Sequence, residues 1–309
     1  MEKLKALALK FKSLIGLFFL CIVISIITPR FLNINNLLNV LTQVSVNAVI
    51  AIGMSFVILT GGIDLSVGSI LAVTGALAAS LISKQNSLFL AILLSLIVGA
   101  LIGAFNGLLV SKGKIQPFIV TLAGMTIFRG VTYVYTNGTP ISGLSKDFTF
   151  IGNARVLGIP FPVIITFIVF LIAWYLINET RFGRYVYALG GNEDSARLSG
   201  INTDSIKTMV YVISGITAAI GGIIVTSRIG SASPNAGSGY ELDAIAAVVL
   251  GGTSLAGGEG SIAGTIIGAM IIGVLNNGLN LMNVSPFYQS IVKGLVILLA
   301  VLIDKKNKK

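Results

Sequence analysis

Residues 88–110 read LFLAILLSLIVGALIGAFNGLLV, an apolar run without a charged side chain. An α-helix crosses the hydrocarbon core of a bilayer with about 20 apolar residues, because each residue advances it by about 1.5 Å. This run therefore predicts a transmembrane helix.

The composition of the whole chain extends this prediction. Of 309 residues, 55% are hydrophobic and only 10% are charged, and the mean hydropathy is +0.96. A soluble domain carries about a quarter charged residues, so this chain could not cover a surface that faces water. We predict an all-α polytopic membrane protein that forms a single transmembrane domain over residues 1–309.

Apolar runs recur along the chain and predict about ten membrane spans. Two of them are separated only by GGID, and another ends in GGTSLAGGEGS. Broken or re-entrant segments of this kind line cavities, because lipid cannot satisfy the backbone of an interrupted helix. The predicted spans cover residues 13–29, 45–61, 65–83, 88–110, 116–136, 161–178, 208–228, 243–256, 262–282 and 287–303.

Basic residues orient these spans. The leader MEKLKALALKFK resembles a signal peptide, but no small-residue cleavage site follows it, so we expect an uncleaved span. Lys and Arg gather on the cytoplasmic side of membrane proteins, which explains the net charge of +10 without a nucleic-acid partner. We expect both termini and a loop at 179–207 inside, and loops at 137–160 and 229–242 outside. The inner side receives Lys3, Lys5, Lys10, Lys12, Lys112, Lys114, Arg181, Arg184, Arg197, Lys207 and the tail 304–309; the outer side keeps Arg30, Lys84, Lys146, Arg155 and Arg228.

Signatures of catalysis are missing from the sequence. There is no histidine, one cysteine (Cys21), no GxxxxGK[ST] phosphate loop, and no HExxH, CxxC or GxSxG motif. We expect no enzyme activity, no metal and no cofactor in this chain. Uphill transport would need an ion gradient or another subunit.

Glycines spaced four residues apart predict close helix packing. They occur as Gly99, Gly103 and Gly107, and again as Gly260, Gly264 and Gly268. Small residues at this spacing let helix backbones approach each other inside a membrane.

Several polar side chains fall within or between the predicted spans. Asp64 is either a carboxylate at membrane depth, which would mark the translocation path, or the N-cap of a helix beginning at Leu65, and we favour the cap. Arg129 and Lys293 either pair with structural partners, which we favour, or contact a substrate.

Asparagines near the C-terminus form a second group of path candidates. Asn276, Asn280 and Asn283 follow helical spacing and predict one wettable stripe, which either binds a polar solute or joins helices. Asn106 and Asn47 offer the same choice, with helix joining favoured.

The longest polar run, ALGGNEDSARLSGINTDSIK at 188–207, predicts a short capped helix over 193–199. Asn192 would cap it, Glu193 and Asp194 would complement the helix dipole, and Gly200 would end it. Glu193 and Arg197 are four residues apart, in the favourable order for an ion pair. Ala196 and Leu198 offer an apolar contact. A helix this short holds only when it docks on something, so we expect a soluble partner there.

The same segment resembles the coupling-helix region of permease subunits of ATP-binding-cassette sugar importers, the branch serving ribose and related monosaccharides. The resemblance continues through 34–76, 112–141, 239–265 and 275–304, and so covers nearly the whole chain. It implies that two copies form a path for the sugar in the bacterial plasma membrane. It also implies an ATPase subunit that receives residues 192–200 inside, and a sugar-binding protein that docks on the outer loops.

Two other classes of function remain open. A gradient-driven transporter usually needs titratable groups at depth, and only Asp64, Glu241 and Asp243 are candidates. A passive channel or scaffold would leave the capped cytoplasmic helix unexplained. Within the importer family, another pentose, a hexose or a similar small polyol is the alternative substrate.

Overall fold

The computed structural model describes residues 12–307, and its regular elements are helices apart from one hairpin of two two-residue strands. The predicted positions of Lys3, Lys5, Lys10 and the last two lysines lie outside the described residues. Six helices are long and apolar enough to cross a membrane: α3 (Ile34–Leu59), α5 (Leu88–Ser111), α6 (Pro117–Thr136), α8 (Phe161–Asn178), α11 (Thr203–Ile229) and α13 (Ile262–Leu281). An all-α polytopic membrane protein is therefore confirmed.

The remaining elements complete the described chain. They are α2 (Lys12–Ile27), η1 (Pro29–Leu32), α4 (Val67–Ser83), α7 (Lys146–Asn153), β1 (Arg155–Val156), β2 (Ile159–Pro160), α9 (Arg181–Gly191), α10 (Glu193–Leu198), α12 (Tyr240–Leu250) and α14 (Pro286–Asn307). The helices α7 and α9 were not predicted from the sequence.

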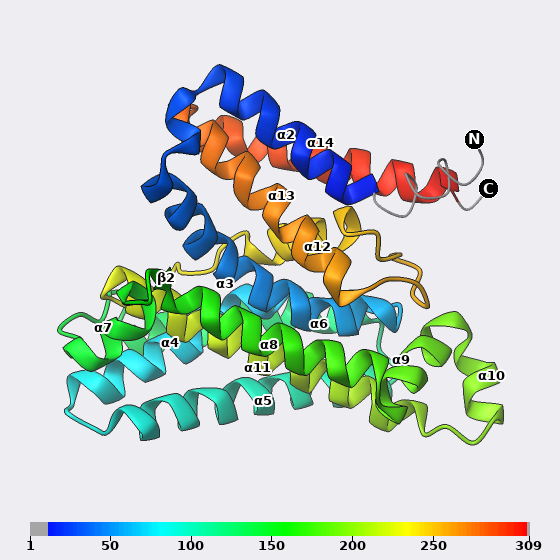
Figure 1. Ribbon diagram of the computed structural model, residues 1–309. Coiled ribbons are helices and arrows are strands. Elements are labelled where there is room, and N and C mark those ends of the chain that lie inside the picture. Colours follow the sequence, from blue (N-terminus) through cyan, green and yellow to red (C-terminus); the bar gives the residue numbers. More distant parts are fainter. Residues whose placement is uncertain (1–11, 308–309) are drawn as a thin grey trace.

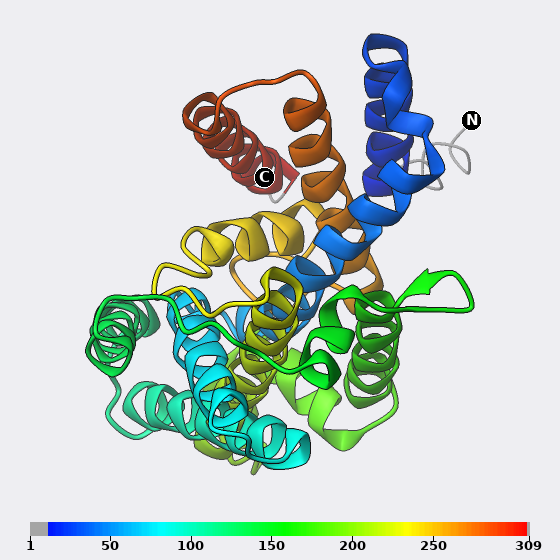
Figure 2. The same ribbon diagram turned by 90° about the vertical axis from the view of Figure 1, so that its left-hand side faces the viewer.

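The helices form two groups joined by α3. In one group α11 packs against α4 and α5, and α4 packs against α6. In the other, α13 packs against α2 and α12, and α12 packs against α14. α3 contacts α11 from the first group and α12 and α13 from the second (Figures 1 and 2).

α3 forms the centre of the core. Every residue from Val44 to Leu59 is buried except Asn47. The helix begins at Ile34, well before the span predicted at 45–61, because Asn33 caps it by accepting a hydrogen bond from the backbone N–H of Asn35.

The predicted glycine motifs do pack helices closely. A Cβ at Gly103 would stand 2.2 Å from the carbonyl oxygen of Tyr211, so α5 and α11 touch backbone to backbone. A Cβ at Gly268 would stand 1.9 Å from the carbonyl oxygen of Ala247 on α12. Gly260 does not share this role, because it precedes the N-cap residue of α13.

The span predicted at 243–256 is wrong at its C-terminal end. α12 ends at Leu250, and the chain turns at Gly252, whose φ of +93° is open to glycine but strained for other residues. Residues 251–261 instead form a glycine-rich connection to α13.

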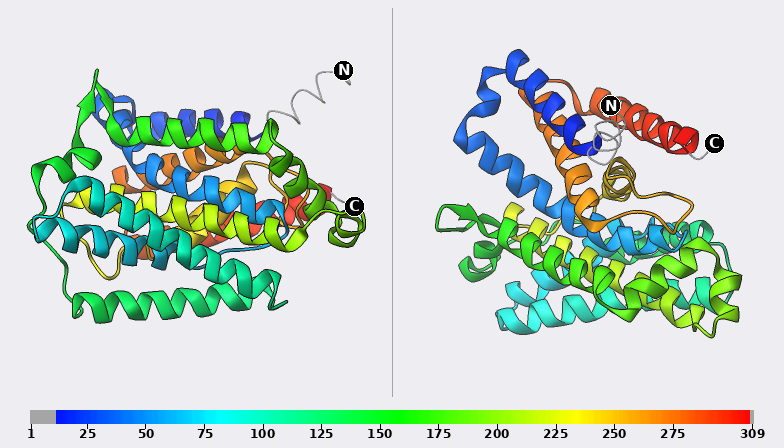
Figure 3. Two further views of the ribbon diagram at one scale, coloured as in Figure 1. Left: turned by 90° about the horizontal axis from the view of Figure 1, so that it is seen from below. Right: turned by 45° about the vertical axis from the view of Figure 1, so that its right-hand side comes forward.

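The two ends of the bundle carry different loops. α7 and β2 lie at one end, whereas α9 and α10 lie at the other (Figure 1). Figure 3 (left) shows the same two ends of the bundle from below. Figure 3 (right) shows that α2 and α14 belong to the second helix group, on the side of the molecule opposite α5.

Candidate translocation cavity and coupling segment

The segment predicted as a short capped helix is present as α10. The side chain of Asn192 accepts a hydrogen bond from the N–H of Ser195 at 2.8 Å. Gly200 follows with a φ of +83°, in the left-handed region where glycine ends helices. The predicted cap, helix and terminator are therefore confirmed, and the helix ends one residue earlier than expected.

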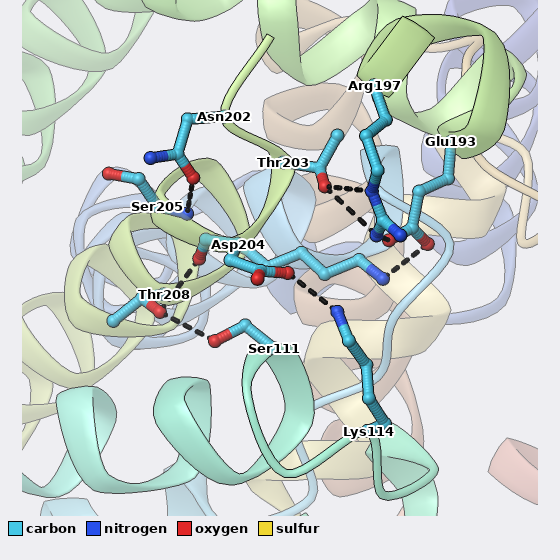
Figure 4. A network of polar contacts seen from close by, with 10 residues as sticks. Ser111, Lys114, Glu193, Arg197, Asn202, Thr203, Asp204, Ser205 and Thr208 are labelled. Carbon is cyan, nitrogen blue, oxygen red and sulfur yellow. Dashed lines mark hydrogen bonds and ion pairs between the residues drawn. The ribbon is translucent and has the colours of Figure 1, made fainter.

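Glu193 ties α10 to the rest of the chain (Figure 4). Its carboxylate accepts from Arg197 at 2.9 Å, which confirms the predicted ion pair, and from Lys207 on α11 at 2.5 Å. Arg197 also donates to the hydroxyl of Thr203 at 3.3 Å. Its guanidinium therefore turns back toward its own chain.

A second set of contacts joins this region to the α5–α6 connection. Lys114 pairs with Asp204 at 2.7 Å, and the hydroxyls of Ser111 and Thr208 are 2.9 Å apart (Figure 4). The start of α11 is thus held from two sides.

The two apolar residues of α10, Ala196 and Leu198, differ in burial. Ala196 is 4% exposed and packs inward, whereas Leu198 is 89% exposed. Only Leu198 is free to make the predicted apolar contact with a partner.

A polar cavity of about 240 Å³ lies where the two helix groups meet. Its residues stand near the ends of α11 and α13 and near the starts of α12 and α14, so it lies toward the end of the bundle that carries α7. Four helices each supply a pair of polar side chains three or four residues apart. The lining consists of Gln43, Val44, Asn47, Arg228, Tyr240, Asp243, Gly273, Asn276, Asn280, Gln289 and Lys293.

Unsatisfied acceptors and one ion pair give this cavity its chemistry. The buried Oδ1 atoms of Asn47 and Asn276 have no hydrogen-bond partner within residues 12–307. Asn280 accepts from Gln289 at 2.8 Å, and Lys293 pairs with Asp243 at 2.9 Å. The lining can accept hydrogen bonds from hydroxyl groups without presenting an unpaired carboxylate.

The predicted asparagine stripe is only partly right. Asn276 and Asn280 line the cavity, but α13 ends at Leu281, and Asn283 is exposed with a φ of +55°. Asn277 joins helices instead, exchanging two hydrogen bonds with Asn36 at 2.9 and 3.0 Å.

Asp64 lies away from the cavity in a buried network between α3 and α4. One carboxylate oxygen accepts from the N–H and hydroxyl of Ser66, and the other accepts from the hydroxyl of Ser214 on α11 at 2.7 Å. The amide of Asn106 donates to Ser66 at 2.9 Å. The predicted helix start at Leu65 is wrong, because α4 begins at Val67 and Ser66 holds the N-cap position. Asp64 nevertheless accepts the backbone N–H of Ser66 at 3.0 Å, which is the kind of bond that the cap prediction expected.

Arg129 and Lys293 both have protein partners, as favoured from the sequence. Arg129 donates to the carbonyl oxygens of Pro234 and Ala236, each at 2.7 Å. It also borders a recess together with Glu241, while Lys293 pairs with Asp243.

The two loops predicted to face outside are joined to each other. Ile141 and Ala232 exchange backbone hydrogen bonds at 3.0 and 2.9 Å. The side chain of Asn153 donates to the carbonyl oxygens of Ser227 and Arg228. The loops 137–160 and 229–242 are therefore in direct contact through this bridge.

Sequence reasoning missed Gln43 and Gln289 among the lining residues, although a signal was available. Gln43 and Asn47 are four residues apart, as are Gln289 and Lys293, and each pair repeats the Asn276–Asn280 spacing. A search for polar pairs at helical spacing across all spans would have found them.

Comparison with known proteins shows which family this chain belongs to. A family model described as the permease component of branched-chain amino acid transport systems matches residues 36–301. The chain belongs to this permease family. The permease is therefore a transport subunit and not an enzyme, and it is a multi-pass protein of the bacterial inner membrane.

Curated relatives match the permease over nearly its full length. It is 56% identical to the ribose import permease of Escherichia coli K12, covering 98% of this chain and 96% of the relative. The Bacillus subtilis ribose import permease is also 56% identical, with 95% and 92% covered. The D-allose transport permease of E. coli is 44% identical, with 93% and 90% covered. No solved structure matches the chain.

Proposed function

We propose that the permease forms the membrane path of an ATP-driven importer for ribose or a closely related monosaccharide. The observation that carries this proposal is the 56% identity to ribose import permeases from two distant bacteria. The allose and xylose transport permeases are less similar, at 44% and 40%. Another pentose, a hexose or a similar small polyol is the alternative substrate.

The chemistry of the cavity supports a neutral polyol. Sugar hydroxyls donate hydrogen bonds, and the lining includes Asn47 and Asn276, whose buried amide oxygens have no partner within residues 12–307. Asp243 is balanced by Lys293, so a cationic solute finds no unpaired carboxylate there. We assign Asn276 and Asn280 to the path.

The other path candidates take supporting roles in this proposal. Asp64 and Asn106 are fully buried in their own network and would hold α4 against α5 and α11. Asn283 lies on the surface beyond α13, where it would border the entrance to the path.

We further propose ten spans with both termini in the cytoplasm. The spans would be α2, α3, α4, α5, α6, α8, α11, α12, α13 and α14, forming one domain. The predicted cytoplasmic loop 179–207 lies with α9 and α10 at one end, opposite the loop that holds α7 (Figure 1). The lysine and arginine distribution then follows the positive-inside bias.

The partners follow from this orientation. An ATPase subunit, which binds ATP and Mg²⁺, would receive α10 with its flanking residues Asn192 and Gly200. The exposed Leu198 would supply the apolar contact, beside the charged Asp194. A sugar-binding protein would dock on the joined loops 137–160 and 229–242.

A second copy would cover the face made by α6 and the start of α12. This face carries a recess of about 330 Å³ lined by Met125, Thr126, Arg129, Ser238 and Glu241. Partly exposed charges at this depth are costly against lipid. A homodimer that buries this face would remove that cost.

Uptake by reconstituted vesicles tests the proposal. Vesicles holding the permease and its ATPase subunit receive labelled ribose with the sugar-binding protein outside and ATP inside. We expect uptake that an ATP trap abolishes and an uncoupler leaves unchanged. Loss of uptake with the uncoupler alone would identify a gradient-driven carrier instead. Competition by unlabelled allose and xylose ranks the substrates.

A further inference from the structure

The backbones of three segments are in direct contact: the end of α3, the end of α9 and the connection 251–261. The N–H of Gly258 donates to the carbonyl oxygen of Leu59, the last residue of α3, at 2.9 Å. A Cβ at Gly190 on α9 would stand 1.8 Å from that same oxygen and 2.5 Å from the nitrogen of Gly258. We call this contact of Leu59, Gly190 and Gly258 the glycine junction.

Tyr187 adds a side-chain bond to the junction. Its hydroxyl donates to the carbonyl oxygen of Gly260 at 2.9 Å. Burial raises the pKa of Tyr187, and an ordinary tyrosine already keeps its hydroxyl proton near neutral pH, so the donor is present. Gly260 directly precedes Ser261, whose side chain caps α13.

The junction lies next to α10 along the chain. Only Asn192 separates α9 from α10, and it bonds to both: its N–H donates to Ala188, and its side chain accepts from Ser195. No flexible linker stands between the two helices. A displacement of α10 therefore displaces α9 as well.

The segments held at the junction lead to the cavity. α3 carries Gln43 and Asn47, and α13 carries Asn276 and Asn280. The connection 251–261 continues from α12, which carries Tyr240 and Asp243. Asn47 lies twelve residues, or about 18 Å of helix, from Leu59, so a rigid α3 carries a movement at one end to the other.

We propose that Tyr187 is a positioning residue that couples movement of α10 to the helices lining the cavity, acting through the glycine junction. This inference rests on the proposed function, in which α10 receives the ATPase subunit. Tyr187 contacts neither sugar nor nucleotide. It holds the start of α13 to α9 while both move.

The experiment uses the complete importer in vesicles, with Tyr187→Phe and the matched control Tyr185→Phe. Tyr185 lies on the same helix, is 37% exposed, and no hydrogen bond of its hydroxyl is recorded within residues 12–307. Sugar uptake and ATP hydrolysis are measured on the same vesicles, with co-purification of the ATPase subunit as the measure of assembly.

Tyr187→Phe should keep assembly and ATP hydrolysis, and should lower the sugar imported per ATP hydrolysed about fivefold, which corresponds to about 1 kcal/mol. Tyr185→Phe should leave this ratio unchanged. An unchanged ratio in Tyr187→Phe, or a loss that merely follows the amount of folded protein, would overturn the inference. If wild-type uptake needs no ATP, the proposed function itself fails. ATP-dependent uptake with an unchanged ratio in Tyr187→Phe would instead reject only the role of Tyr187.

Gly190→Ala provides a second variant at the same junction. Its methyl group would push α9 away from α3 and should lower the same ratio even where Tyr187 is intact. If Gly190→Ala does not fold, Tyr187→Phe carries the test alone.

Discussion

Lys293 on α14 donates from Nζ to Oδ2 of Asp243 on α12 at 2.9 Å, and both side chains line the polar cavity. The side chains are 28% and 11% exposed, so both charges are largely removed from water. Each charge is tolerated there because the other is present.

Removing one member of this pair should destabilise the permease. Lys293→Met leaves Asp243 unpaired and should lower the free energy of unfolding by up to about 3 kcal/mol. The double variant Lys293→Met, Asp243→Asn should recover most of that loss. Thermal unfolding in detergent measures both. Strictly additive losses would show that the two groups do not interact.

Leu198 should matter for assembly and not for folding. Leu198→Asp removes an 89% exposed side chain and should leave thermal stability unchanged while it reduces co-purification of the ATPase subunit. Leu157, 98% exposed at the hairpin tip near the opposite end, provides the matched control. Leu157→Asp should leave co-purification intact. Equal losses from both variants would argue against docking at α10.

Thiol labelling should separate the two ends of the bundle. In a Cys21→Ser background, Ser195→Cys on α10 should react with an impermeant maleimide only after cells are opened. Leu157→Cys should react in intact cells. Labelling of Ser195→Cys from outside would reverse the proposed orientation.

Helix bounds were predicted best from the sequence where a proline in the first turn marks the start of the helix. The span 161–178 matches α8, which has Pro162 in its first turn, and the span 116–136 begins one residue before Pro117. The span 243–256 failed because its apolar residues continue past Leu250, where the backbone has already turned. Hydropathy does not record such a break.

The cavity was only partly predictable. Spacing along α13 identified Asn276 and Asn280, but extending the stripe to Asn283 failed because the helix had ended. The ion pair of Lys293 with Asp243 depends on which helices are neighbours. No spacing within one helix carries that information. The capped helix α10 was predictable because its cap, charges and terminator are all local.

The close contact of α5 with α11 predicts a sharp difference between two glycines. A methyl group at Gly103 would stand 2.2 Å from the carbonyl oxygen of Tyr211, whereas at Gly130 on α6 nothing lies within 4 Å. Gly103→Ala should cost about 1–3 kcal/mol of stability through overpacking. Gly130→Ala should be neutral or slightly stabilising, because alanine favours helices. Thermal unfolding of both variants checks this, and equal melting temperatures would contradict the packing.

Replacing the adjacent asparagines Asn276 and Asn277 on α13 should have different effects, one on sugar uptake and the other on stability. Asn277→Ala breaks two hydrogen bonds to Asn36 and should lower stability by about 1 kcal/mol, at about 0.6 kcal/mol for each bond. Asn276→Ala removes an oxygen that has no partner within the described chain, so stability should hold while the sugar concentration for half-maximal uptake rises. Thermal unfolding and vesicle uptake measured on both variants separate the two effects. If Asn276→Ala imports sugar normally and Asn277→Ala does not, the path lies on the other side of α13, toward α2 and Asn36 at the start of α3.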